Sequence, residues 1–547
     1  MEAKTSTNPG HQRRWLGLLL FAACLLTAIY AWVVLTDAVP WLRGPKPWPP
    51  EWQWPYAPLS RSQAGRIGVQ VGFLVAYLAV AALLMRLSGR RRVRGVLVLA
   101  VLFFVLWQLI QTWVRDQSLL DTLIFRTYAP VLNGFFLAPA QVASVGETLR
   151  HYAAAMPNFF SDRALTHPPG LFLFYAVANG LFERLPQFSA WFAPVARSWA
   201  LPGRDWPQLV DFLVVSAFAT SWVQIILTAL APLSLFGVLH ALGSTTAPAS
   251  GPRRIWGAQA EPSDFVLWCI LALPLISSLS LFFLQWDSVY LTLGLAAWWL
   301  AIRAQNRTWQ GARLSPGAAV TWFLAGLVLS VLFWLSFGNV VWGGLIGLHV
   351  LWRSGVRWRL DRRPLALSAI AAGLALMVAA WALPWLLAYL AWGMRVTEIT
   401  RVGLDLHYEV VTARRDYRLW LWMNPVDFSL WLGPAPLVLG LAGSLWLWSR
   451  TRSILSGDEL PVSCPAPGVD LSLDLAGMAA AFWLTLIYLD LSGTTRGEVG
   501  RLWMFLMPFP ILFGLALPWR PRKRWVILAL LAAGSWVMAY AIAGITV

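Results

Sequence analysis

The chain has 547 residues, of which 58% are apolar and 12% charged, and its mean hydropathy is +0.61. Apolar stretches close to the ~20 residues that span a bilayer as a helix recur along the whole chain, which excludes a soluble globular protein and predicts an all-α polytopic membrane protein. The net charge of +17 does not indicate nucleic-acid binding, because the basic residues are divided among short connections between apolar stretches.

The first apolar stretch, Trp15 to Thr36, is predicted to be a retained transmembrane helix. It is longer than the apolar core of a signal peptide, and no small-residue cleavage site precedes Asp37. Residues 1–14 then form a short basic tail. The later apolar stretches are, in chain order, 67–85, 95–114, 169–186, 208–241, 263–284, 287–302, 317–336, 338–352, 365–392, 428–449, 475–489, 501–518 and 525–545.

The most basic connections predict how the spans are oriented. RLSGRRRVRG, RSGVRWRLDRRP and PWRPRKRW should all face the cytoplasm by the positive-inside rule. They share one side only if 169–186 and 208–241 together cross the membrane an odd number of times. We expect 169–186 to be re-entrant, because two crossings within 208–241 would be short. The result is one transmembrane domain, 1–547, with about 13 transmembrane helices in the plasma (inner) membrane, its N-terminus cytoplasmic and its C-terminus outside.

Two long outer loops, 115–168 and 394–427, hold many of the acidic residues. The first loop ends in THPPG and is longer than an ordinary connection. Its VASVGETLRHYAAAMP portion predicts an amphipathic interfacial helix, with four apolar residues at helical spacing: Val142, Val145, Leu149 and Tyr152. The two prolines after His167 force an extended entry to the next helix and hold His167 at the interface. The second loop has balanced charge and is either solvated or part of a site.

Asp287 separates two apolar stretches in LFFLQWDSVYLTL, with no room for a loop. A carboxylate placed at or just below the outer interface is costly and indicates a function. The alternative is a carboxylate that reaches water from a tight turn.

The segment LDLSGTTRGEVGRLWMFLMP places Arg496, Glu498 and Arg501 in a Gly-rich turn at the mouth of a span. Arginine binds phosphate bidentately, and backbone N–H groups at a helix start can also hold a phosphate. The turn therefore predicts a phosphate site. The alternative is an Arg501–Glu498 pair that serves topology alone.

Taken together, the loop ending in THPPG, the later acid in FFLQWDSVY and the sequence RGEVGRLWMFLMP resemble the GT-C glycosyltransferase superfamily, which includes protein O-mannosyltransferases and the lipid A aminoarabinose transferase. The resemblance implies a GT-C-like fold with re-entrant and interfacial helices and a lipid groove. It also implies transfer of a sugar from a polyprenyl-phosphate or polyprenyl-diphosphate carrier at the outer face, with an acid of the first large outer loop as base. Inversion at the sugar carbon is expected because the transfer would be a single displacement.

The base is expected to be Asp121, then Asp116, then Asp37, in that order. This chain has an extra apolar pair before the THPPG loop, so "first outer loop" describes either 37–66 or 115–167, and the family's acidic pair near the start of the loop is absent. The loop beside Asp37, LRGPKPWPPEWQWPY, is rich in Trp and Pro, which suits sugar stacking or an interfacial aromatic belt.

The remaining residues have expected binding roles. Arg501 and Arg496 would bind the departing phosphate. Asp287 and Glu498 would orient the acceptor or, with His167, hold a divalent metal ion, although no ligand spacing demands one. Cys24, Cys269 and Cys464 show no CxxC spacing and indicate neither a metal cluster nor a disulfide framework.

The expected partners are a polyprenyl-linked sugar donor, the lipid bilayer and an acceptor that is a glycan, a lipid or a protein. One alternative function is a transporter or flippase for a lipid-linked substrate, which should show inverted repeats and charged residues deep within spans. The sequence shows neither, and it lacks the GxxxxGK[ST] motif of an ATP-driven pump. A noncatalytic membrane scaffold is the other alternative, and it predicts that the outer acids share no site.

Overall fold

The computed structural model describes residues 9–47, 51–60, 63–116, 118–243, 263–311, 313–361, 364–457 and 469–542. Within these ranges the regular structure is helical, apart from an isolated antiparallel bridge between Tyr56 and Ile542. Cys464, residues 48–50 of the Trp- and Pro-rich loop, and residues 1–8 of the basic tail lie outside the described residues.

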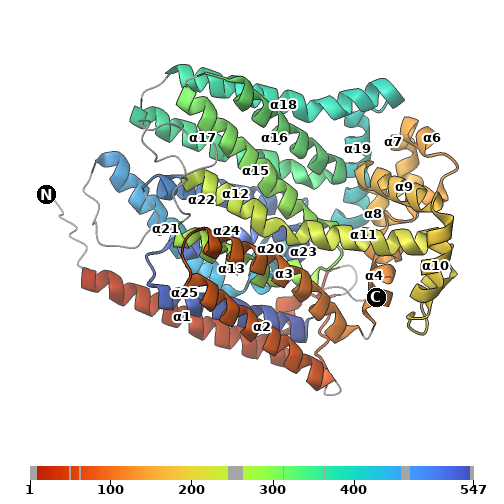
Figure 1. Cartoon of the computed structure of the whole chain (residues 1–547), viewed down its shortest axis with the longest axis horizontal. Helices are drawn as coiled ribbons and strands as arrows, with labels where there is room; N and C mark the ends of the chain where they lie inside the picture. The colour runs from red at the N-terminus through yellow and green to blue at the C-terminus, as the bar shows by residue number, and fades with distance from the viewer. Residues whose placement is uncertain are drawn as a thin grey trace.

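Long helices aligned along one direction form the body of the protein (Figure 1). Of the described helices, eight are long and apolar enough to cross a membrane, or nine if one bent pair counts as a span. The protein is therefore an all-α polytopic membrane protein. The expected number of about 13 spans would also require shorter or less apolar segments. The long helices are α1 (Pro9–Thr36), α2 (Ala64–Met85), α3 (Gly89–Arg115), α11 (Asp211–Ala229), α12 (Ala231–Gly243), α15 (Trp286–Gly311), α16 (Pro316–Leu335), α17 (Val340–Asp361), α18 (Pro364–Trp392), α20 (Tyr417–Leu432), α21 (Pro434–Ser456), α22 (Val469–Ser492) and α25 (Pro521–Ala541).

The segments 169–186 and 208–241, on which the predicted topology depends, form helices of different length. Helices α11 and α12 together form one apolar stretch, Asp211–Gly243, rather than two spans. Pro232 lies in the first turn of α12, where its missing N–H costs little. Helix α9 (Gly170–Glu183) has 14 residues, about 21 Å at 1.5 Å per residue, which is shorter than a ~30 Å hydrocarbon core.

Three other predicted spans are interrupted. The 263–284 stretch divides into α13 (Asp264–Ala272), η7 (Leu273–Leu275) and α14 (Ser277–Leu281), and the 501–518 stretch divides into the end of α23 (Val499–Leu502), η10 (Met504–Leu506) and α24 (Pro508–Ala516). Prolines at the first turns of η7 and α24 explain these breaks. The 428–449 stretch bends by 103° between α20 and α21. The bend is at Gly433, whose φ of +88° favours glycine.

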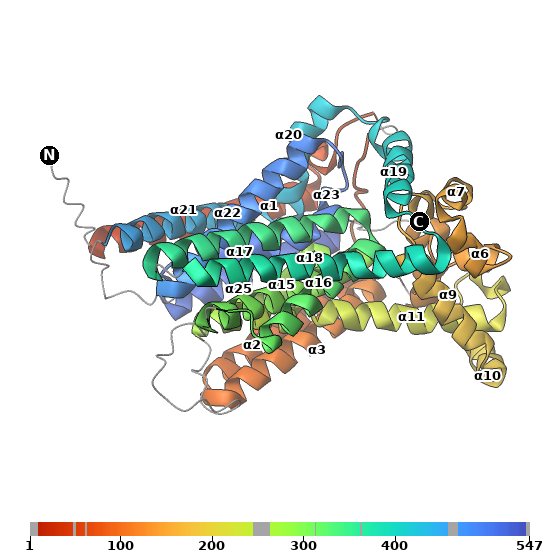
Figure 2. The same cartoon turned by 90° about the horizontal axis from the view of Figure 1, so that it is seen from above.

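One end of the bundle, called the cap end below, carries the short helices of the first long outer loop together with α9, α10 and α19 (Figures 1 and 2). These are α4 (Leu119–Tyr128), α5 (Pro130–Asn133), η3 (Ala138–Gln141), α6 (Val145–Arg150), α7 (Tyr152–Ala155), η4 (Met156–Asn158), α8 (Asp162–Leu165), α10 (Pro186–Arg197) and α19 (Val396–His407). The expected interfacial helix is divided into α6, α7 and η4 by a non-helical His151, and Leu149 and Tyr152 are buried. The loop is therefore an ordered cap.

The opposite end, called the basic end, carries the connections from α2 to α3, from α17 to α18 and from α24 to α25 (Figures 1 and 2). The three basic connections thus share one end, as the alternation of spans requires. The assignment of this end to the cytoplasm stays a prediction.

Near the basic end, a charged pair lies inside the bundle, contrary to the expectation from the sequence. Helices α17 and α22 extend beyond the predicted 338–352 and 475–489, and this brings Arg353 and Asp474 into the interior. Arg353 Nε donates to Asp474 Oδ1 at 2.8 Å, and Arg353 also donates to Gln305 and Asn306 of α15. This network ties three helices together.

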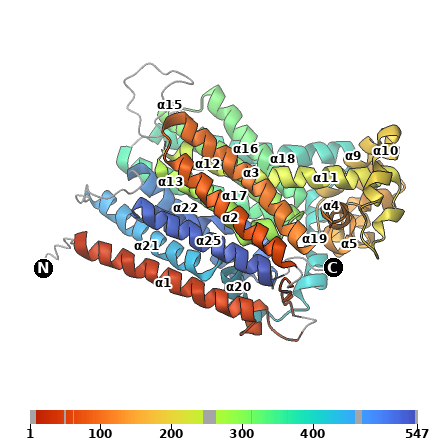
Figure 3. The same cartoon turned by 60° about the horizontal axis from the view of Figure 1, so that its bottom comes forward.

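The first helix and the first loop pack against elements from the other end of the sequence. Helices α1, α21 and α25 lie side by side (Figure 3). The N–H groups of Ala57 and Leu59 donate to the carbonyls of Ala541 and Tyr540 at 2.9 and 3.0 Å. Arg115 at the end of α3 donates to the carbonyls of Ala539 and Ile542, so it caps the last turn of α25.

Candidate functional site

A cluster of charged side chains at the cap end joins three segments that are distant in sequence. Arg501 of α23 lies 2.9 Å from Glu498 (Nη2 to Oε2) and 3.9 Å from Asp287 (Nε to Oδ2), which is in the first turn of α15. The side chains of these three residues are 14% to 23% exposed. They are therefore largely, but not completely, shielded from bulk solvent.

Arg501 has an unused hydrogen-bond donor in this cluster. Its Nη2 is engaged by Glu498, but its Nε is buried and makes no hydrogen bond in the described structure. The 3.9 Å separation from Asp287 is an ion pair and too long for a hydrogen bond. A buried donor without a partner costs free energy, so this atom favours the arrival of an acceptor such as a phosphate oxygen.

The two carboxylates differ in how firmly they are held. Glu498 is bound by Arg501 and also accepts from Arg415 Nη2 at 3.4 Å. Burial alone would raise the pKa of Glu498, but Arg501, Arg415 and Arg163 outweigh it and hold the pKa below its ordinary value. Glu498 is thus a fixed anion, whereas the ion pair of Asp287 with Arg501 is longer, at 3.9 Å, so Asp287 is the less firmly held of the two acids.

Arg163 of α8 brings a second partly buried guanidinium to the cluster. It donates to the carbonyl of Leu132 at 2.7 Å and to the side-chain oxygen of Gln285. Burial and the nearby charge of Arg501 lower the pKa of Arg163 to about 9, and Glu498 and Asp287 act in the opposite direction. Two arginines therefore face two carboxylates in one partly buried site.

His167 lies beside this cluster as a neutral imidazole. Its Nδ1 is 3.0 Å from the hydroxyl of Thr166, and its ring packs edge-on against Phe135 at 4.9 Å. Burial lowers the pKa of His167 to about 3, and the positive charges of Arg163 and Arg501 contribute in the same direction. The ring is therefore a hydrogen-bonding group, and at neutral pH it carries no charge.

Asp427 of α20 binds the backbone of the Gly-rich turn that carries Glu498 and Arg501. Asp427 is buried and accepts from the N–H of Val499 at 2.8 Å, from the N–H of Gly500 at 3.4 Å and from Trp54 Nε1 at 2.6 Å. Glu498 itself has a φ of +57°, an uncommon conformation for a residue with a side chain. The turn is thus fixed by interactions with α20 and the first loop.

Arg496 has a different place from Arg501. Its guanidinium donates to the backbone carbonyls of Thr412, Arg415 and Gly493 at 2.6 to 3.1 Å. These bonds join the second outer loop to the Gly-rich turn. The geometry therefore favours a structural role for Arg496 instead of the expected phosphate contact.

A base has to lie close to the phosphate-binding Arg501, but the structure engages Asp121 and Asp116, the first two expected bases, elsewhere. Asp121 is fully buried and accepts from Leu201 N, Arg204 Nε and Trp206 Nε1 at 2.8 to 3.2 Å. Its oxygens connect α4 to the segment after α10, and its side chain is fully buried, which favours a structural role for Asp121. Asp116 pairs with Arg126 at 3.0 Å.

Asp37, the third expected base, also lies in an ion pair. Arg43 donates to both of its oxygens at 2.7 and 2.8 Å, a bidentate pair within the first loop. The three acids therefore stabilise the segments between helices, and Asp287 is the acid that lies beside an arginine with an unpartnered donor.

The alternative role of Asp287, Glu498 and His167, as ligands of a divalent metal ion, can be compared with the grouping of side chains. In the described ranges, no three His, Cys, Asp or Glu side chains are grouped closely enough to hold a metal. Glu498 is already bound by two arginines, and these compete with any cation. The donor set suits an anion better than a metal ion.

Sequence analysis missed Arg163, Arg415 and Asp427. Arg163 stands in DRALTHPPG, directly before the motif that was recognised, and Arg415 stands in the second outer loop. Arg163 could have been found from its position next to THPPG, whereas Arg415 is 81 residues from Arg496 and lies near none of the three recognised motifs. Asp427 gives no such signal, because its importance depends on the bend that brings α20 under the Gly-rich turn.

Comparison with known proteins identifies no relative of this chain. No family model matches it, and no curated protein or solved structure matches it at a significant level.

Proposed function

We propose that the protein is a membrane glycosyltransferase that moves a sugar from a polyprenyl-phosphate-type lipid donor to an acceptor at the outer face of the membrane. The observation that carries the proposal is the unpaired, buried Nε of Arg501 beside the less firmly held carboxylate of Asp287. Such a pair supplies a cation for a departing phosphate and a base for an acceptor hydroxyl.

In the proposed reaction, Arg501 and Arg163 bind the phosphate of the donor at the mouth of the bundle. Asp287 takes the proton from the acceptor hydroxyl as the acceptor oxygen attacks the anomeric carbon. The bond between that carbon and the phosphate oxygen breaks, and the phosphate leaves with the electron pair, stabilised by the arginines. A single displacement of this kind inverts the anomeric configuration.

The roles of the other groups follow from their contacts. Glu498 orients Arg501 through its 2.9 Å contact, and Asp427 orients the turn. His167, neutral and partly exposed, can donate or accept a hydrogen bond at its remaining ring nitrogen. In this proposal Asp287 replaces Asp121, Asp116 and Asp37 as the base.

The proposal is tested with protein purified into liposomes that contain radiolabelled polyprenyl-phosphate mannose or polyprenyl-phosphate aminoarabinose. We expect release of polyprenyl phosphate from at least one donor when envelope extract is added as the source of acceptor. Arg501→Ala should reduce the rate by ~10²-fold or more, and Arg501→Lys should restore little, because the planar fork is lost. Arg401→Ala is the matched control, because the Arg401 side chain is 84% exposed in α19.

Three outcomes would contradict the proposal. Full activity of Arg501→Ala would remove the phosphate-binding role of this site. Movement of intact donor between leaflets without cleavage would identify a transporter or flippase. Absence of any polyprenyl lipid from the purified protein by native mass spectrometry, together with absence of transfer from either donor, would support a scaffold.

A further inference from the structure

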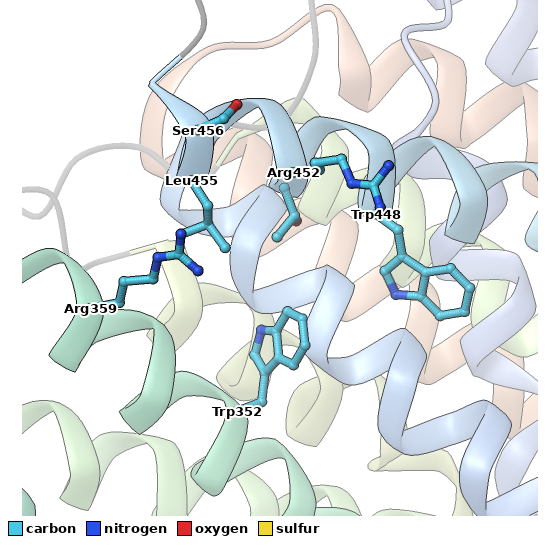
Figure 4. A pocket seen from close by; sticks show the side chains of 7 residues that line it. Trp352, Arg359, Trp448, Arg452, Leu455 and Ser456 are labelled. Atoms are coloured by element: carbon cyan, nitrogen blue, oxygen red, sulfur yellow. The ribbon is translucent and has the colours of Figure 1, made fainter.

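A cavity of about 370 Å³ lies at the basic end, between α17 and α21, far along the bundle from the charged cluster of the cap end. Its lining residues come from two helices (Figure 4). They are Trp352 and Arg359 of α17, and Trp448, Thr451, Arg452, Leu455 and Ser456 of α21.

The charge of this cavity is positive. Arg359 and Arg452 line it from different helices, and none of its described lining residues is acidic. Both arginines are exposed, so their guanidinium groups can move to meet a ligand. Two guanidinium groups beside one cavity are suited to a phosphate, which accepts several hydrogen bonds in the fork geometry of arginine.

An unpartnered hydroxyl gives independent evidence for a ligand. Thr451 is 4% exposed, and its Oγ1 is buried without a hydrogen-bond partner. A threonine inside a helix commonly bonds the carbonyl four residues earlier, but this one does not. The tryptophan N–H groups are already used, because Trp352 donates to Leu473 O and Trp448 to Ala476 O. The tryptophans therefore offer ring surfaces, and Thr451 offers the free polar atom.

An exposed apolar strip leads from the cavity toward the middle of the bundle. Leu348 precedes Trp352 by four residues, and Leu445 and Leu441 precede Trp448 by three and seven, so each follows the same helix face as its tryptophan. These leucines are 40% to 55% exposed. In a membrane protein such a face contacts acyl chains, so polar cavity and apolar strip together match an amphiphile.

We propose that this cavity binds the headgroup of an anionic phospholipid. The phosphate lies between Arg359 and Arg452 and accepts a hydrogen bond from the Thr451 hydroxyl, and the acyl chains lie along the leucines of α17 and α21. Basic pockets between helices at a membrane surface bind anionic headgroups in this way. A soluble anion would fill the polar part but would gain nothing from the apolar strip.

The test measures lipid binding by the purified full-length protein in detergent micelles doped with phosphatidylglycerol or, separately, phosphatidylcholine. We expect phosphatidylglycerol to bind at least tenfold more tightly by native mass spectrometry. The Arg359→Ala/Arg452→Ala protein should lose this preference, and Thr451→Val should weaken it severalfold, since valine preserves the shape but removes the hydroxyl. Arg90→Ala/Arg91→Ala is the matched control, because it removes two exposed arginines from the same end but away from the cavity.

Either of two results would overturn the proposal. The first is equal binding of both lipids, or a preference that survives in Arg359→Ala/Arg452→Ala while that protein remains folded by circular dichroism. The second is displacement of phosphatidylglycerol by inorganic phosphate at a similar concentration, which would identify a site for a soluble anion. Neither result depends on the proposed glycosyl transfer, so this proposal and that one stand or fall separately.

Discussion

The buried bonds of Asp427 predict how firmly the Gly-rich turn is held. In Asp427→Asn, the amide can accept from only one of the two donor groups, either Trp54 Nε1 or the N–H groups of Val499 and Gly500. The other donor group then faces the NH₂ group of the new side-chain amide, which cannot accept a hydrogen bond. An unsatisfied buried donor costs about 1–3 kcal/mol, so the free energy of local opening should fall by about 2 kcal/mol.

The assay is hydrogen exchange of residues 493–503 followed by mass spectrometry. Since 1.4 kcal/mol is a factor of ten, the amides of Val499 and Gly500 should exchange roughly 30-fold faster in Asp427→Asn than in the wild type. Asp405→Asn in α19, where the side chain is 68% exposed, is the control and should leave exchange in this turn unchanged. Equal exchange of residues 499 and 500 in Asp427→Asn and the wild type would refute the reasoning.

Three further predictions concern the acids, the histidine and the topology. Asp121→Asn should make the cap more sensitive to proteolysis, because it disturbs one buried and two partly buried hydrogen bonds. Asp287→Asn should block transfer and leave the cap intact, and the reverse pattern would restore Asp121 as the base. The pKa of His167 is lowered from 6.5 to about 3, so between these pH values the unfolded state binds a proton that the folded state does not. The stability of the wild type should therefore fall as the pH falls. His167→Gln should lose less stability than the wild type between pH 7 and 4, measured by denaturant unfolding. Cysteines introduced at Arg90 and Arg522 should be labelled from one side of the membrane and one at Arg401 from the other, and a shared side for all three would contradict the alternation.

Features that depend on hydropathy and on proline were predictable from the sequence. The 208–241 stretch forms one continuous apolar segment, and the stretch after THPPG is a short helix, because length and proline position act locally. The single helix expected in VASVGETLRHYAAAMP was wrong, since burial of Leu149 and Tyr152 in the cap outweighs the helical periodicity and the chain turns at His151. The breaks in 263–284 and 501–518 follow prolines that were visible but were not given weight.

Residues of the candidate site could be predicted only where a charged residue directly adjoins an apolar stretch in the sequence. Asp287, Glu498 and Arg501 meet because each is at the mouth of a long or interrupted helix at one end of the bundle. The predicted order of the three candidate bases did not take account of which carboxylates already have partners. Asp121, for example, is hydrogen-bonded to Arg204 and Trp206, more than 80 residues later in the chain. Pairings over such distances depend on the tertiary fold, and a single sequence does not contain a local signal for them.

The bonds between the first loop and the last helix impose an order on the assembly of the protein in the membrane. Ala57 and Leu59 have their backbone partners at Ala541 and Tyr540, and Trp54 has its partner at Asp427. The ribosome synthesises the first loop long before these partners, so the loop lacks these hydrogen bonds until the later helices are inserted. The N-terminal helix can enter the bilayer early, but its loop acquires its final structure only when α25 arrives. Synthesis of the last helix is thus the event that completes the backbone contacts of the first loop.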